Sequence, residues 1–169
     1  ILNSSLNDDE TMLALRIFDQ VAIAEGRVHN KNIDEVHFHE VGAVDSIVDI
    51  VGAAICIDYL NVDLIISSPI EVGYGTLHCA HGILPVPAPA TAEILKEVPI
   101  IAKNVPFEAT TPTGAAILKA LASKFTYEKH IEKIKIGYGW GYKDSVNMHN
   151  VIRVMSYENK GTTSKVFIT

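Results

Sequence analysis

The segment that most constrains the fold is residues 36–52, VHFHEVGAVDSIVDIVG. In it a pattern that is typical of a strand is followed directly by a pattern that is typical of a helix. His37 and His39 alternate with apolar neighbours, which is the period of a strand with one polar and one apolar face. Both imidazoles are therefore expected on the same side of that strand. Glu40 and a turn at Gly42 then separate the strand from a helical pattern. A structural role, in hydrogen bonds to neighbouring strands, is the alternative for the histidine pair.

The run 44–59 is apolar nearly all round and predicts a helix that is buried on most sides. Its exceptions fall on one stripe, within roughly 60° of arc: Asp45, Asp49, Gly52 and Cys56. The positive helix N-terminus alone would also explain Asp45. It does not explain Asp49, because like charges four residues apart cost about 0.2–0.5 kcal/mol. Two carboxylates beside a glycine notch therefore indicate a site.

The composition is that of a folded protein with a substantial core, since 48% of the 169 residues are hydrophobic. We expect one domain, or two subdomains with a boundary near residues 98–110. A net charge of -6 without a basic run argues against nucleic acid and against an anionic membrane as partners, and it suits the attraction of cations.

No apolar stretch approaches the roughly 18 residues that span a bilayer, and no signal peptide is visible, so we expect a cytoplasmic protein. Cys56 and Cys79 are too few for a disulfide framework and are expected to be reduced. The chain begins at Ile1 rather than Met, and we expect it to be part of a longer protein.

The order of the elements predicts an α+β fold, in which helices and short strands form layers with a partly antiparallel sheet. Asp8 or Asp9 should cap a first helix that runs to Glu25 and ends at Gly26. A strand is expected over 63–72, interrupted at Pro69. Further helices are predicted at 89–97 and 112–125, and short strands at 100–103, near Phe107, at 131–138 and at 150–157.

A second motif covers residues 73–91, GYGTLHCAHGILPVPAPAT. Gly73 and Gly75 allow a close approach of the backbone or a positive φ. Three metal-ligating side chains then follow within four residues: His78, Cys79 and His81. The signal for a metal is moderate, because a second ligand pair of the zinc-finger kind is missing.

The segment TTPTG at 110–114 predicts a helix start with proline in its first turn and hydroxyl groups around it. Unpaired N–H groups at such a start bind a phosphate or carboxylate readily, and ordinary capping by Thr111 is the alternative. The GYGWG segment at 137–141 is read as a lid or a hairpin connection, since it lacks the context of a dinucleotide fingerprint. We expect solvent exposure for the histidines without an evident partner: His29, His130 and His149.

Four motifs in order over residues 36–154 resemble the LarC family, the nickel-insertion proteins of lactate racemase cofactor maturation: VHFHEVGAVDSIVDIVG, GYGTLHCAHGILPVPAPAT, TPTGAAIL and GYGWG. The resemblance implies a nickel chelatase or cyclometallase of the lyase class. It would insert Ni²⁺ into a pyridinium-3,5-bisthiocarboxylic acid mononucleotide, with consumption of CTP and with Mg²⁺ or Mn²⁺. In that family CTP binds to a C-terminal domain, and this chain, residues 1–169, resembles only the N-terminal portion.

The family and the residues together suggest a concrete hypothesis. Nickel would be held or delivered by imidazoles and one carboxylate: His37, His39, Glu40, His78 and His81. The two helix carboxylates or one imidazole would take the proton that the ring loses: Asp45, Asp49 and His39. The mononucleotide phosphate would bind at the glycine loop and the threonine helix start: Gly73, Gly75, Thr111, Thr113 and Gly114.

Two other classes of function remain open at this point. A non-catalytic nickel carrier or store would bind metal without a small-molecule pocket. A structural or assembly domain would use the polar stripe for internal hydrogen bonds or a subunit contact. For the insertion protein we expect the other proteins of the lactate racemase pathway as partners, and a homo-oligomer.

Overall fold

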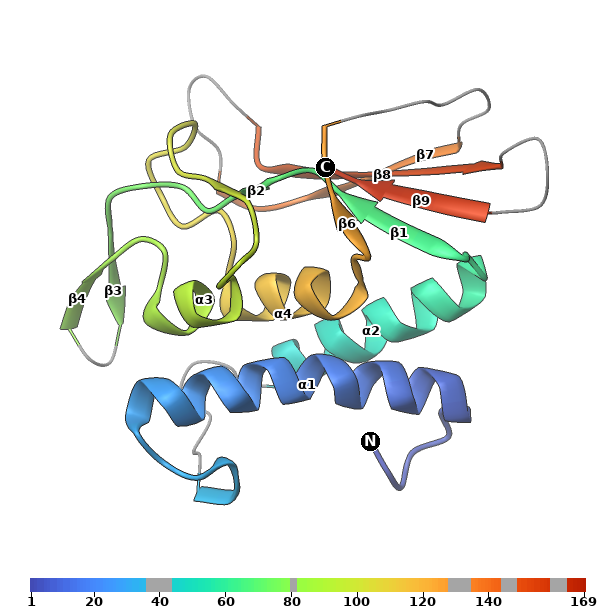
Figure 1. The fold of residues 1–169 in the computed structure, drawn as a ribbon, viewed down its shortest axis with the longest axis horizontal. Coiled ribbons are helices and arrows are strands. Elements are labelled where there is room, and N and C mark those ends of the chain that lie inside the picture. Colours follow the sequence, from blue (N-terminus) through green and yellow to red (C-terminus); the bar gives the residue numbers. More distant parts are fainter. Residues whose placement is uncertain (36–43, 80–81, 128–134, 144–148, 159–163) are drawn as a thin grey trace.

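The computed structural model describes residues 1–35, 44–79, 82–127, 135–143, 149–158 and 164–169. Seen in Figure 1, the structure is layered, with the main sheet above, α2 (Val44–Leu60), α3 (Pro89–Ile94) and α4 (Pro112–Leu121) in the middle, and α1 (Asp8–His29) beneath. A short 3₁₀ turn, Ile33–Glu35, follows α1. The mixture of helices and sheets confirms the α+β class.

The main sheet has the strand order β6-β1-β9-β8-β7. β1 is parallel to β6 and β9, whereas β8 is antiparallel to both β9 and β7, so the sheet is partly antiparallel as predicted. Its strands are β1 (Leu64–Ser67), β6 (Lys124–Phe125), β7 (Lys135–Trp140), β8 (Val151–Glu158) and β9 (Ser164–Ile168). Two small pairs complete the strands: β2 (Ile70–Glu71) with β5 (Ile100–Ile101), and β3 (Thr76–Cys79) with β4 (Gly82–Pro85).

The N-cap of helix α1 lies one residue earlier than predicted, and the helix ends later than predicted. Asn7 caps it rather than Asp8 or Asp9, in a capping box with Glu10. Gly26 does not end the helix but is buried inside it, and Asn30 closes it with a left-handed φ of 50°. Tertiary packing of the buried face outweighs the cost of about 1 kcal/mol of a helical glycine, because α1 lies against all three other helices.

Helix α2 has the predicted extent, but the prediction that it is buried on most sides is wrong. One face is buried against α1 and α4, through Ser46, Ile50 and Ala54. An apolar face is exposed instead, with Val44 76% and Val48 61% exposed. Periodicity reports that a residue is apolar, but not whether a neighbour covers it.

Several element boundaries differ from the prediction for identifiable reasons. The 112–125 helix stops at Leu121, because Ser123 and Thr126 donate backbone hydrogen bonds to β1 and draw β6 into the sheet. α3 stops at Ile94 rather than at Glu97, which has a left-handed φ of 65°. The break at Pro69 between β1 and β2 is confirmed.

Three further differences concern strands. The prediction of a lid or hairpin connection at 137–141 is wrong for residues 137–140, which belong to edge strand β7, paired with β8. The residues around Phe107 are described and form no strand. Strand β9 and the β3–β4 hairpin were not predicted, and the predicted strand at 36–41 lies outside the described residues. None of the described helices combines the length and apolar character that crossing a bilayer requires.

The main hydrophobic core lies between the sheet and the helices, and it draws on both sides of residues 98–110. Alternate residues of the sheet strands point away from the helices and form a smaller cluster: Ile66, Met155, Tyr157 and Phe167. The two-subdomain organisation stays a prediction.

We expect Ile50→Ala to lower the free energy of unfolding by about 2–5 kcal/mol, because the fully buried side chain would leave a cavity between α2 and α1. Val48→Ala on the exposed face of the same helix should change it by no more than about 0.5 kcal/mol. Urea unfolding measures both. Equal effects would contradict the assignment of the buried face.

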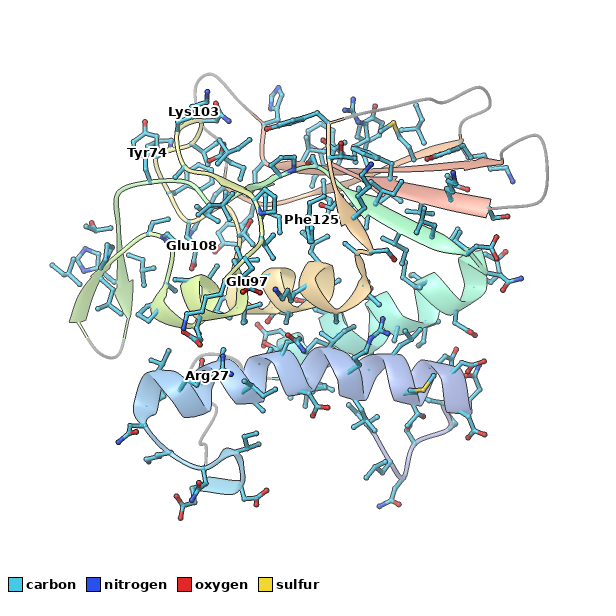
Figure 2. The ribbon with its side chains drawn as sticks, viewed as in Figure 1. Arg27, Tyr74, Glu97, Lys103, Glu108 and Phe125 are labelled. Carbon is cyan, nitrogen blue, oxygen red and sulfur yellow. The ribbon has the colours of Figure 1, made fainter. Side chains whose placement is uncertain are left out.

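An ion pair ties α1 to α3, where Arg27 lies 2.9 Å from Glu93 (Figure 2 labels Arg27 beneath α3). Hydrogen bonds from Lys96, and then from Arg27, hold the pKa of Glu93 below its ordinary value. The unfolded chain therefore takes up this proton at a higher pH than the folded chain does. The stabilisation is complete above the unfolded pKa and is lost as pH falls through the lowered pKa.

We therefore expect Glu93→Gln to melt at a lower temperature than the wild-type chain at neutral pH, and the difference to disappear in strong acid. Thermal melts over a pH series measure this difference. Glu97→Gln, an exposed glutamate after the same helix, is the matched control. A difference that stays constant with pH would contradict the ion-pair argument.

Candidate functional site

A cavity of about 670 Å³ lies where α2 and α4 begin. Its wall comes from several segments: the first turns of both helices, β3, the residues before α4, and the two residues beyond Gly141. The described lining residues that carry polar groups are Asp45, Ser46, Asp49, Thr76, His78, Glu108, Thr111, Thr113, Tyr142 and Lys143. A volume of this order is typical of small-molecule sites.

The cavity brings together five residues that the sequence predicted as site residues: Asp45, Asp49, His78, Thr111 and Thr113. The two carboxylates and the imidazole are exposed at its surface. They come from segments far apart in the chain, since His78 lies on β3, opposite Ile83 of β4. Side chains of α2 and α4 also meet here, since the Thr113 hydroxyl donates to the Ser46 hydroxyl oxygen at 3.5 Å.

Thr111 caps α4, as the alternative interpretation expected. Its Oγ1 accepts a hydrogen bond of 3.3 Å from the backbone N–H of Gly114. The hydroxyl nevertheless keeps its own hydrogen to donate, so capping does not compete with binding an anion. The same applies to Ser46, whose oxygen lies next to the Thr113 hydroxyl.

The two predicted glycines have different surroundings. Gly73 is buried with φ +81°, and a Cβ there would overlap the carbonyl oxygen of Phe107. Its requirement for glycine is thus explained by packing against the segment that lines the cavity. Gly75 has φ +103° and accepts a hydrogen bond of 3.0 Å from the Val86 N–H. Neither glycine lines the cavity, and their part in binding stays a prediction.

Four predicted ligands lie outside the described residues: His37, His39, Glu40 and His81. Among the residues that are described, no three His, Cys, Asp or Glu side chains are grouped closely enough to hold a metal ion. The nickel ligand set therefore stays a prediction. Cys56 is a free, exposed thiol on α2.

Of the described histidines, only His78 lines this cavity. His29 is half-buried with its Nε2 3.2 Å from Glu25, so the expectation of solvent exposure is wrong for it. His149 is exposed as expected, and its ring packs edge-on against Trp140 at 5.8 Å. His130 lies outside the described residues.

Sequence reasoning missed five of the polar lining residues: Ser46, Thr76, Glu108, Tyr142 and Lys143. Glu108 lies in the segment that descends to α4, above the helical layer (Figure 2). The position of Glu108 just before TTPTG was a signal that could have been used. Tyr142 and Lys143 follow GYGWG directly, but no local pattern indicates that this end meets α2.

A second cavity, of about 310 Å³, lies at the carboxyl ends of β1 and β9 and shares Phe107 with the first. Its wall is mainly apolar. Glu71, the one acidic side chain among its described lining residues, accepts hydrogen bonds from the backbone N–H groups of Gly73 and Lys103 at 3.0 and 3.3 Å and from the Asn104 amide. Because these bonds hold the segment before α4, Glu71 has a structural explanation, and the larger cavity is the candidate site.

The cavity thus combines carboxylates and an imidazole, which are possible metal ligands, with a helix start, which favours anions. The whole chain, residues 1–169, matches the family model described as nickel insertion protein. The chain therefore belongs to the nickel insertion protein family, which confirms the resemblance seen in its motifs.

Curated relatives carry the name pyridinium-3,5-bisthiocarboxylic acid mononucleotide nickel insertion protein. The Clostridium kluyveri protein is 57% identical over 155 residues, which is 91% of this chain and 39% of that protein. The Clostridium acetobutylicum protein is 59% identical over 155 residues, 91% of this chain and 37% of its own length. The Geobacillus kaustophilus protein is 47% identical over 164 residues, 97% of this chain and 40% of its own length.

The chain thus spans about two fifths of the length of the curated relatives it matches. No solved structure matches it.

Gly73→Ala should lower the free energy of unfolding by more than about 1 kcal/mol, because the added Cβ overlaps a backbone carbonyl and φ is positive. Gly52→Ala is the matched control: a Cβ there meets nothing within 4 Å, in the middle of α2. It should stabilise the chain by about 0.5–1 kcal/mol. Thermal or urea unfolding measures both, and stabilisation by Gly73→Ala would contradict the packing argument.

Proposed function

We propose that this chain supplies the nickel- and substrate-binding part of a nickel insertion reaction, in which Ni²⁺ enters a pyridinium-3,5-bisthiocarboxylic acid mononucleotide. One observation carries the proposal. Asp45, Asp49 and His78 line the same cavity as the threonine start of α4, in a chain 57–59% identical to proteins named for this reaction.

The chemistry of the side chains fits the delivery of nickel as a substrate. Imidazole is a good ligand for Ni²⁺, whereas carboxylates bind it more weakly and release it more easily. His78 and the two α2 carboxylates, Asp45 and Asp49, line the cavity. In our proposal His37, His39, Glu40 and His81 complete the set.

Insertion at the pyridinium ring requires that a ring carbon exchanges its proton for nickel. The carbon–hydrogen bond breaks, a carbon–nickel bond forms with the same electron pair, and one proton leaves. A base must take this proton, and Asp45, Asp49 or His39 would do so in our proposal. The thiocarboxylate groups on either side of the ring carbon supply sulfur ligands, which nickel accepts.

The phosphate of the mononucleotide would bind at the start of α4. The Thr111 and Thr113 hydroxyls line the cavity there. The positive end of the α4 dipole favours an anion there, although the Gly114 N–H already donates to the Thr111 side chain. This division separates the metal-binding end of the cavity from the phosphate-binding end.

The size of the cavity favours insertion over the carrier alternative. A carrier or store needs only a ligand set for the metal, whereas about 670 Å³ lies within the range that encloses small molecules. We assign CTP, with Mg²⁺ or Mn²⁺, to the part of the protein outside this chain. The lyase class, cytoplasmic location, homo-oligomeric state and partnership with the lactate racemase pathway belong to the same proposal.

The direct test is titration of the metal-free chain with Ni²⁺ by calorimetry, beside the double variant Asp45→Ala, Asp49→Ala. We expect saturable binding in the wild type and a loss of affinity of about tenfold or more in the variant, since it removes two of the weaker ligands. Asp9→Ala, Asp19→Ala is the control, because it removes two exposed carboxylates of α1 far along the chain from the cavity residues.

Nickel affinity that is unchanged in the Asp45, Asp49 variant would reject the assignment of nickel to α2. A loss of affinity shared by the control would indicate a non-specific effect of charge. In the whole protein the same variant should form no nickel-containing mononucleotide, as measured by mass spectrometry of the product.

A further inference from the structure

The GYGWG motif leads directly to the only cation on the described wall of the candidate cavity. Tyr142 and Lys143 follow β7 and line the cavity together with the starts of α2 and α4. The other charged groups of that wall are carboxylates, from Asp45, Asp49 and Glu108, and His78 adds an imidazole. A single lysine among three carboxylates calls for a physical explanation.

We propose that Lys143 is a substrate-selecting residue that pairs with the phosphate of the mononucleotide in this cavity. The inference deepens the proposed function and rests on it. It names the group that distinguishes a mononucleotide from its nucleoside.

The first step of the argument is electrostatic. A mononucleotide that carries a phosphate and two thiocarboxylates is strongly anionic, and three carboxylates would repel it. Ni²⁺ near Asp45, Asp49 and His78 reverses the local charge only at that end of the cavity. The phosphate therefore needs a cation elsewhere on the wall, and Lys143 is the one that the described wall provides.

The second step is that no ion pair of Lys143 is found among the described residues. Its Nζ instead lies 5.7 Å from the centre of the Tyr142 ring, within the range of a cation–π contact. This contact orients the ammonium group without neutralising its charge. Within the described part of the chain, the ammonium group is therefore available to pair with an anion.

The third step concerns how the sheet positions this lysine. The Gly141 N–H donates a hydrogen bond of 2.8 Å to the Asn150 carbonyl, next to the start of β8. A Cβ at Gly141 would meet the side-chain amide of Asn150, which would have to shift, so the two segments approach closely here. The pairing anchors the backbone two residues before Lys143, and the sheet thereby carries the lysine to the helix starts.

The phosphate, rather than the ring, is the group that this lysine suits. The ring must lie at the nickel-binding end, where its sulfur groups and reacting carbon meet the metal. The threonine start of α4 offers Thr111 and Thr113 hydroxyls but no charge of its own. A lysine is a point charge with three donors, which complements hydroxyl and N–H donors around a phosphate.

The test uses two stable pyridinium probes, nicotinic acid mononucleotide and its nucleoside, which lacks the phosphate. Calorimetry of the full chain with each probe measures the contribution of the phosphate. We expect Lys143→Ala to weaken mononucleotide binding about tenfold, in line with the loss of a hydrogen bond to a charged group, and to leave nucleoside binding unchanged. Lys143→Arg should retain most of the affinity.

Lys135→Ala is the matched control, because it removes an exposed lysine of β7 that does not line the cavity. It should change the affinity for neither probe. A wild-type chain that binds the mononucleotide while Lys143→Ala binds it equally well would overturn this inference and leave the proposed function intact. Equal weakening for both probes would also overturn it, because the lysine would then act on the ring or on the fold.

A wild-type chain that binds neither probe would reject the cavity as the mononucleotide site. In that case the proposed function at this site fails, and the role of Lys143 fails with it. The pair of probes thus distinguishes the two failures.

Discussion

The burial of one face of α1 against α2, α3 and α4 is the interaction on which the rest of the structure depends. Ile17 and Val21 of α1 are fully buried, as is Ile50 of α2, and all three belong to one core with residues of α3, α4 and the sheet. Because α1 lies beneath the helical layer (Figure 1), it holds together the helices whose starts form the cavity. Apolar burial of this kind is non-directional. Burial alone therefore does not fix where the residues of the cavity wall lie, and directional hydrogen bonds and close backbone contacts do so instead.

Those specific contacts converge on residues 103–113. Glu71 holds Lys103 and Asn104 by hydrogen bonds to its carboxylate, and its carbonyl accepts a bond of 2.7 Å from the Thr110 hydroxyl. Gly73 permits the close approach of Phe107 just beyond. One strand end thus orients the wall segment that carries Glu108 and the threonine start of α4. A small shift of this segment would move both the cavity wall and the phosphate-binding end of our proposal.

The distribution of charge in the cavity connects the proposal with the comparisons. In our proposal the carboxylates and the imidazole form only part of a nickel site, since the described residues hold no group of three metal ligands, while a helix start and one lysine suit an anion. Two carboxylates four residues apart on one helix face, as at Asp45 and Asp49, repel each other at a cost of about 0.2–0.5 kcal/mol. In our proposal nickel bound near this pair would offset the repulsion.

The sequence by itself determined the extent of α2, the break at Pro69 and the threonine cap of α4, because periodicity and capping depend on neighbours within a few residues. Only the tertiary structure decided which apolar face of α2 is covered and that residues 137–140 belong to an edge strand, since both depend on distant partners. It also decided that Lys143 lines the cavity of Asp45 and Asp49. The pairing of β7 with β8 sets that neighbourhood, and no local pattern encodes the pairing of distant strands.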